Sequence, residues 1–208
     1  MFNIIFKGKY KDEKQLIENS KLQKNSVMFK EESNVTQAFI SGLKFVIPIS
    51  AIIIILFLII VKLNNLKLQY SVLHFGISSV LIMPLMYIHE FIHALTYPIK
   101  SIKYIYSKPE EMALFVYCND VVSKIRFVFI CLMPTILLTI IPSIFAMVFI
   151  NSINIQFSID IIYIAIAMCI GALGDFTNVY NTLKQVPKHS IVFNYGYHSY
   201  WIKNTSQD

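Results

Sequence analysis

Long apolar stretches alternate with polar segments along the whole chain. The apolar stretches comprise residues 38–61, 70–99, 127–150 and 161–183. A helix rises about 1.5 Å per residue, so each stretch is long enough to cross a hydrocarbon core of roughly 30 Å. The pattern therefore predicts an all-α transmembrane fold with about four membrane-spanning helices.

The loop between the second and third stretches has a different pattern. Within residues 103–118, two runs rich in β-forming residues flank the segment Ser-Lys-Pro-Glu-Glu, and Pro109 lies in the break between them. Such runs on either side of a proline-bearing break are typical of strands joined by a turn. We therefore expect a short β-hairpin between spans 2 and 3.

The composition agrees with a lipid environment. Hydrophobic residues make up 56% of the 208 residues and charged residues only 14%, whereas soluble domains average about 25% charged residues. The 18 Lys and Arg against 12 Asp and Glu give a net charge of +6. No basic stripe with interleaved aromatic residues accompanies this excess, so we expect the lipid bilayer and not nucleic acid as a partner. No pattern defines an oligomeric state.

The positive charges also predict the orientation in the membrane. Counted in chain order, the five polar segments contain 7, 2, 5, 0 and 3 Lys and Arg. Cytoplasmic segments carry the excess of these residues, so both termini and the middle loop are expected in the cytoplasm. This gives a multi-pass protein of the cell membrane with a cytoplasmic N-terminal segment (1–37), a four-helix membrane domain (38–183) and a cytoplasmic tail (184–208).

The second apolar stretch contains the sequence His89-Glu90-Phe91-Ile92-His93, an HExxH motif. In a helix, residues i and i+4 lie on one face, so both imidazoles can reach one Zn²⁺. Glu90 flanks that face, where it can act as the general base of a metal-assisted hydrolysis. Ionisable groups at membrane depth are costly and indicate a functional site.

Catalytic zinc usually has three protein ligands, so a third must come from elsewhere. The metzincin pattern is excluded, because Thr96 and Ile99 stand where it requires Gly and His. Asp175 is the one charged residue of the fourth stretch, and it follows Gly171 and Gly174. Glycines allow a neighbouring helix to approach closely.

The depths of the three residues agree. From Lys100, His93 lies seven residues into the membrane and His89 eleven, while Asp175 lies nine residues in from Lys184. At about 1.5 Å per residue, these depths are about 10, 16 and 14 Å. We therefore expect His89, His93 and Asp175 to hold the zinc ion. The other histidines, His74, His189 and His198, are expected at the interface or in the tail.

These residues resemble a known group. The segment HEFIHAL in a membrane helix, the hairpin-like loop and the late GALGD segment look like the bacterial "putative zincin peptidase" membrane family, which is similar to site-2 intramembrane metalloproteases. The resemblance spans roughly residues 20 to 202. It implies that His89 and His93 are histidine ligands of zinc, Asp175 the aspartate ligand and Glu90 the catalytic acid and base.

The chain departs from the site-2 protease pattern at one place. Those proteases carry an Asn-Pro-x-x-Asp-Gly-like signature, whereas here Gly174 precedes Asp175, Phe176 follows it and no proline is near. The expected function is a zinc-dependent metalloprotease that hydrolyses peptide bonds of a membrane-associated protein or peptide. Two alternatives stay open: a non-catalytic zinc-binding regulator or transporter component, and a zinc hydrolase with a non-peptide substrate.

Overall fold

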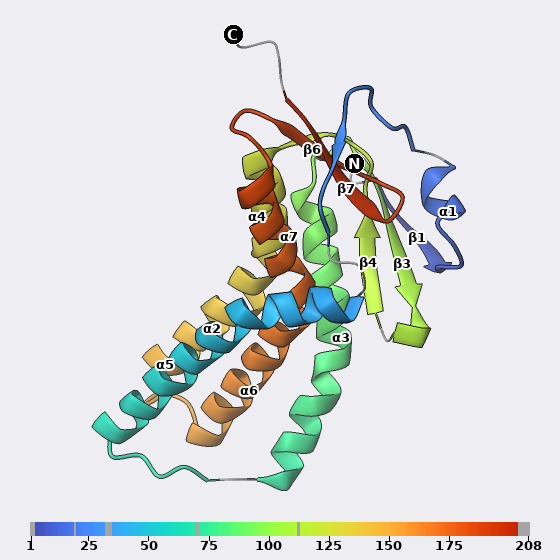
Figure 1. Cartoon of the computed structure of the whole chain (residues 1–208). Coiled ribbons are helices and arrows are strands. Elements are labelled where there is room, and N and C mark those ends of the chain that lie inside the picture. Colours follow the sequence, from blue (N-terminus) through green and yellow to red (C-terminus); the bar gives the residue numbers. More distant parts are fainter. Residues whose placement is uncertain (1–2, 19, 32–34, 70, 112, 204–208) are drawn as a thin grey trace.

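The structure is a computed structural model, and it describes residues 3–18, 20–31, 35–69, 71–111 and 113–203. Its helices are α1 (Lys14–Ile17), α2 (Val35–Leu63), α3 (Val72–Thr96), α4 (Lys124–Thr135), α5 (Ile141–Val148), α6 (Ile155–Gly171) and α7 (Leu173–Gln185), with a 3₁₀ turn at Pro109–Glu111 and a π-helical segment, η2, at Ile136–Ile140. Its strands are β1 (Asn3–Lys9), β2 (Val27–Met28), β3 (Ile102–Lys108), β4 (Ala113–Tyr117), β5 (Val122–Ser123), β6 (Ile191–Tyr195) and β7 (His198–Ile202). Figure 1 shows the strands gathered at one end of the molecule and the long helices extending from the other.

Three helical stretches among the described residues are long and apolar enough to cross a membrane. They are Ile40–Leu63 in α2, Val72–Thr96, which is α3, and Lys124–Val148, which joins α4, η2 and α5. The pair α6 and α7 makes a fourth if it is one span, although it bends by 51°. Tyr70, where the second span was expected to begin, lies outside the described residues.

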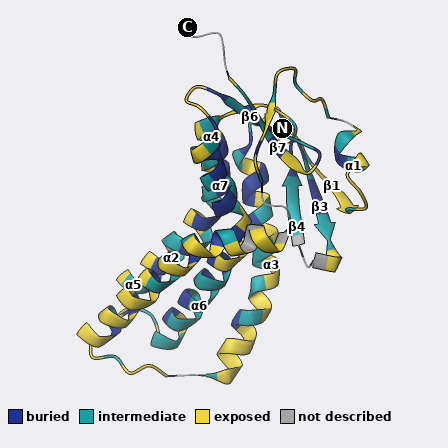
Figure 2. Ribbon diagram, viewed as in Figure 1, coloured by how far each residue is buried: buried dark blue, intermediate teal, exposed yellow. Residues whose placement is uncertain are grey.

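The outer faces of these helices expose apolar side chains. Figure 2 shows exposed residues along α2, α5 and the far half of α3, and Met83 on α3 is 75% exposed. Soluble monomers rarely leave a large continuous apolar surface in water. These surfaces suit contact with lipid tails.

Polar side chains begin several of the apolar helices. Ser71 accepts a hydrogen bond from the backbone of His74 at the start of α3, and Ser123 accepts one from Arg126 at the start of α4. Such N-caps satisfy backbone N–H groups that the first helical turn leaves without partners. The positions at which α3 and α4 begin therefore follow from local sequence.

The predicted all-α fold class is wrong, because the structure is mixed α/β with two sheets. The antiparallel strands β3 and β4 do not stand alone, since β1 pairs in parallel with β3 to give the order β1-β3-β4. The second sheet has the order β2-β7-β6-β5 and unites residues from the N-terminal segment, the middle loop and the tail. Strands β1, β2 and β5 find their partners across long sequence separations, so a scan for local hydrophobicity does not detect them.

The core at the sheet end joins the second sheet to the helices. It includes Phe29, Cys118, Phe127, Val186 and Val192, all buried. The three cysteines are free and buried, as the apolar surroundings of Cys131 and Cys169 indicate. This core holds the ends of α3, α4 and α7 against the sheets, which is where the candidate site lies.

Candidate metal centre

The structure brings the three expected ligands together from two helices. His89 and His93 lie one turn apart near the end of α3, and Asp175 lies in the first turn of α7. Asp175 Oδ2 is 3.0 Å from His89 Nε2, and Asp175 Oδ1 is 3.2 Å from His93 Nε2. The two Nε2 atoms are 3.2 Å apart. The exposed fraction is 3% for the His89 side chain, 9% for that of His93 and 15% for that of Asp175.

These spacings fit a single divalent ion. Zinc binds imidazole nitrogen and carboxylate oxygen at about 2.0–2.2 Å, and a tetrahedral arrangement at that radius separates neighbouring ligand atoms by about 3.3–3.5 Å. The observed separations of 3.0–3.2 Å are close to this range. Two nitrogen donors and one oxygen donor are also a typical catalytic zinc set, which leaves a position open for substrate or water.

A break between α6 and α7 places Asp175 at the start of a helix. The two helices meet at Ala172, so Asp175 lies in the first turn of α7. A negative charge is stabilised there by the helix dipole. A Cβ atom on Gly171 would lie 3.0 Å from Met86 Sδ, so this glycine permits close approach of α6 to α3 one turn before His89. Gly174 has no such neighbour.

His93 is held by a second contact that the sequence analysis missed. Its Nδ1 donates to the main-chain carbonyl of Ile130 on α4, at 2.9 Å. Because a carbonyl can only accept, Nδ1 carries a proton, and Nε2 faces Asp175 and His89. Donation by the second ring nitrogen is the usual way in which a metal-binding histidine is oriented. The partner is a main-chain atom, so its residue type gives no signal in the sequence.

Glu90 lies beside the cluster and faces β4. The backbone of Val116 on β4 lies near its carboxylate, and α3 packs against β4. Glu90 is not among the three residues whose ligand atoms converge. Glu90 therefore lies next to the converging residues without being one of them.

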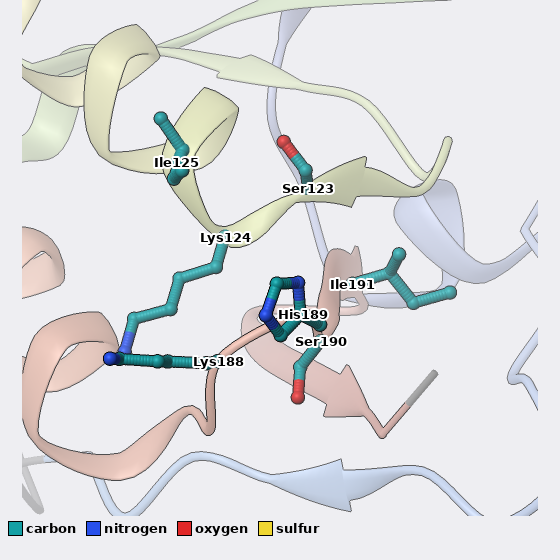
Figure 3. Close-up of a pocket in the computed structure, with 7 residues that line it drawn as sticks. All are labelled: Ser123, Lys124, Ile125, Lys188, His189, Ser190 and Ile191. Carbon is teal, nitrogen blue, oxygen red and sulfur yellow. The ribbon is translucent and has the colours of Figure 1, made fainter. Parts of the chain in front are cut away.

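The remaining histidines lie elsewhere. His74 Nδ1 is 2.7 Å from Asp160 Oδ2, and His198 Nδ1 is 2.7 Å from Glu31 Oε2. His189 lines a separate hollow of about 530 Å³ between the start of α4 and the start of β6 (Figure 3). The other lining residues of this hollow are Ser123, Lys124, Ile125, Lys188, Ser190 and Ile191. Neither tail histidine therefore joins the cluster of His89, His93 and Asp175.

A comparison with protein families gives one match. The model of the family described as "Putative zincin peptidase" matches residues 82–191, which include the HExxH motif and Asp175. No curated protein and no solved structure matches the chain. The family implies zinc, and the cluster of His89, His93 and Asp175 can bind such an ion. Because the match covers more than half of the 208 residues, the chain belongs to this zincin peptidase family.

Proposed function

We propose that this chain is a membrane-embedded, zinc-dependent metalloprotease that hydrolyses peptide bonds of a membrane-associated substrate. Its family supports a metalloprotease-like activity. The observation that carries the proposal is the convergence of His89, His93 and Asp175 beside Glu90, among apolar helices. Similarity to site-2 proteases stays a prediction and adds the expectation of a substrate within the membrane.

The proposed roles divide between three ligands and one base. His89, His93 and Asp175 would hold zinc, which when bound acts as a Lewis acid toward a carbonyl and makes water more acidic. Glu90 takes a proton from the attacking water while the water oxygen forms a bond to the scissile carbonyl carbon. As the C–N bond breaks, Glu90 delivers this proton to the leaving amine nitrogen.

Strand β4 offers a way to hold the substrate. In the described part of the chain, β4 has a strand neighbour on one side only, β3. The backbone of Val116 lies near Glu90 and α3 packs against β4, so β4 and its open edge lie beside the helix that carries the HExxH motif. A substrate segment that has unwound can add to this edge as a further strand, with main-chain hydrogen bonds giving affinity.

We expect N-methylation of the substrate backbone to weaken cleavage if the substrate pairs with β4. Methylating one amide that points toward β4 removes one hydrogen bond, worth about 0.5–1.5 kcal/mol, and should lower kcat/KM roughly 2- to 13-fold. The matched control is a peptide methylated at the neighbouring amide, which points away from the strand. Equal cleavage of the two methylated peptides would argue against strand addition.

A non-catalytic zinc protein is the rival reading. Structural zinc sites are usually closed by four protein ligands, whereas the described residues bring only three together here. A structural site also has no need of a base such as Glu90. Zinc content and hydrolysis are measured for purified wild-type protein and for Glu90→Gln. If the variant retains zinc but loses the hydrolysis that wild type shows, the protein is an enzyme. If wild-type protein binds zinc without any hydrolysis, the non-catalytic alternative is selected.

The proposed orientation places the site in the cytoplasmic half of the bilayer. It rests on the 7, 2, 5, 0, 3 distribution of Lys and Arg. Cysteines introduced near residues 65 and 155 should react with an impermeant maleimide added to intact cells, and one near residue 110 should react only after lysis. The three native cysteines are buried, and labelling of the protein without an introduced cysteine gives the background signal. Labelling of position 110 from outside would reverse the orientation.

A further inference from the structure

The Ile130 carbonyl that accepts the hydrogen bond from His93 lies four residues before a proline in α4. In an α-helix, the carbonyl of residue i accepts from the N–H of residue i+4. For Ile130 that residue is Pro134, which lies inside α4. Proline has no N–H, and its ring pushes the carbonyl of residue i−4 aside. The Ile130 carbonyl therefore lacks its helical donor and accepts from His93 Nδ1 instead.

We propose that Pro134 is a positioning residue of the metal centre. It frees the Ile130 carbonyl, which fixes the proton of His93 on Nδ1 and turns Nε2 toward Asp175 and His89. The inference rests on the proposed role of His93 as a zinc ligand. Pro134 itself is buried in α4 and touches neither the substrate nor the reacting atoms in this assignment.

A second contact, one turn away, holds the two helices in the required register. Arg126 donates from Nε and Nη2 to the carbonyl of Thr96, at 2.9 and 2.6 Å. On α4, Ile130 lies four residues after Arg126. On α3, His93 lies three residues before Thr96. The helices run in opposite directions, so the two contacts lie side by side. The positive charge of Arg126 also interacts favourably with the negative, C-terminal end of the α3 helix dipole.

Burial raises the free-energy cost of losing the hydrogen bond between His93 and Ile130. His93 is 7% exposed and Ile130 is 2% exposed. Water has little access there, so an Nδ1–H without this carbonyl would lack a partner at a cost. Conversely, a residue with an N–H at position 134 would compete with His93 for the same acceptor.

The test is Pro134→Ala in the full chain, with Pro142→Ala as the matched control. Pro142 lies in the first turn of α5, in the same apolar stretch. Loss of the hydrogen-bond partner of a metal ligand typically weakens metal binding 10- to 100-fold. We expect that loss for Pro134→Ala in competition with a chromogenic chelator, and an unchanged zinc affinity for Pro142→Ala. The melting temperature of metal-free Pro134→Ala should be unchanged or higher, because alanine restores a helical hydrogen bond.

Nitrogen-15 NMR of histidine-labelled, metal-free protein gives an independent readout. In wild-type protein the Nδ1 proton of His93, assigned by its absence in His93→Asn, should be hydrogen-bonded and slow to exchange with water. In Pro134→Ala it should exchange faster. Wild-type zinc affinity in Pro134→Ala, an equal loss in Pro142→Ala, or a His93 Nδ1 without a protected proton in wild type would each overturn the proposal. Wild-type protein that binds no zinc would instead refute the proposed function, and the NMR result would still decide on Pro134.

Discussion

Replacing Glu90 with glutamine should abolish most proteolysis while leaving zinc in place. Glutamine has nearly the same size and keeps hydrogen-bonding capacity, but it cannot take up the proton of the attacking water. General acid–base groups typically contribute about 10²–10⁴-fold to the rate, so cleavage of a membrane-spanning peptide in proteoliposomes should fall by that factor. Zinc content, measured on the same preparation, should not change, because Glu90 is outside the converging ligand set.

Glu110→Gln is the matched control for this experiment. Glu110 is an exposed glutamate that pairs with Lys9 at the surface and is not among the converging ligands. The variant should cleave and bind zinc like wild type. Undiminished cleavage by Glu90→Gln would remove Glu90 from the mechanism, and loss of zinc in that variant would mean that it supports the metal instead.

Replacing Asp175 with alanine should remove zinc and activity together. The carboxylate lies between both imidazoles, with its two oxygens 3.0 and 3.2 Å from their Nε2 atoms. Removing a ligand should weaken zinc binding more than the roughly 10- to 100-fold loss typical of groups that only support a ligand. The measurement is a chelator competition on purified protein, run beside the cleavage assay.

Asp160→Ala controls for the loss of a carboxylate from the same pair of helices. Asp160 lies on α6, where it contacts His74 at 2.7 Å and not the ligand cluster. This variant should keep its zinc. Asp175→His should recover part of the zinc affinity lost in Asp175→Ala, because imidazole is also a zinc ligand. Full zinc binding by Asp175→Ala would rule out the aspartate as third ligand, while the reading of the HExxH motif would survive.

Much of the candidate site can be predicted from single residues. The i, i+4 spacing of His89 and His93 places both imidazoles on one face of a helix whatever surrounds it. Asp175 is conspicuous because a lone carboxylate in an apolar stretch is costly without partners. The structure brings all three together, although their role as ligands stays a prediction until zinc is measured.

The sheets could not be predicted in the same way. Strand β1 pairs with β3 from Asn3↔Ile102 onward, and β2 pairs with β7 at Val27↔Trp201. Neither pairing is local, and what stabilises each strand is a partner far away in the sequence. For this reason the N-terminal segment and the tail have the pattern of polar flanks of a helical protein, although the N-terminal segment supplies strands to both sheets and the tail supplies strands to the second.

The apolar spans and the HExxH helix are predictable from the chain alone, because helix length, capping and i, i+4 spacing depend on residues close together in the chain. Three further features are visible only in the folded chain: the break at Ala172 that puts Asp175 at the start of α7, the approach of β4 to Glu90, and the donation from His93 to Ile130. The last two of these features join distant segments, and in both of them the partner is a main-chain group. Every residue type carries the same main-chain groups, so such partners become visible only when the chain is folded.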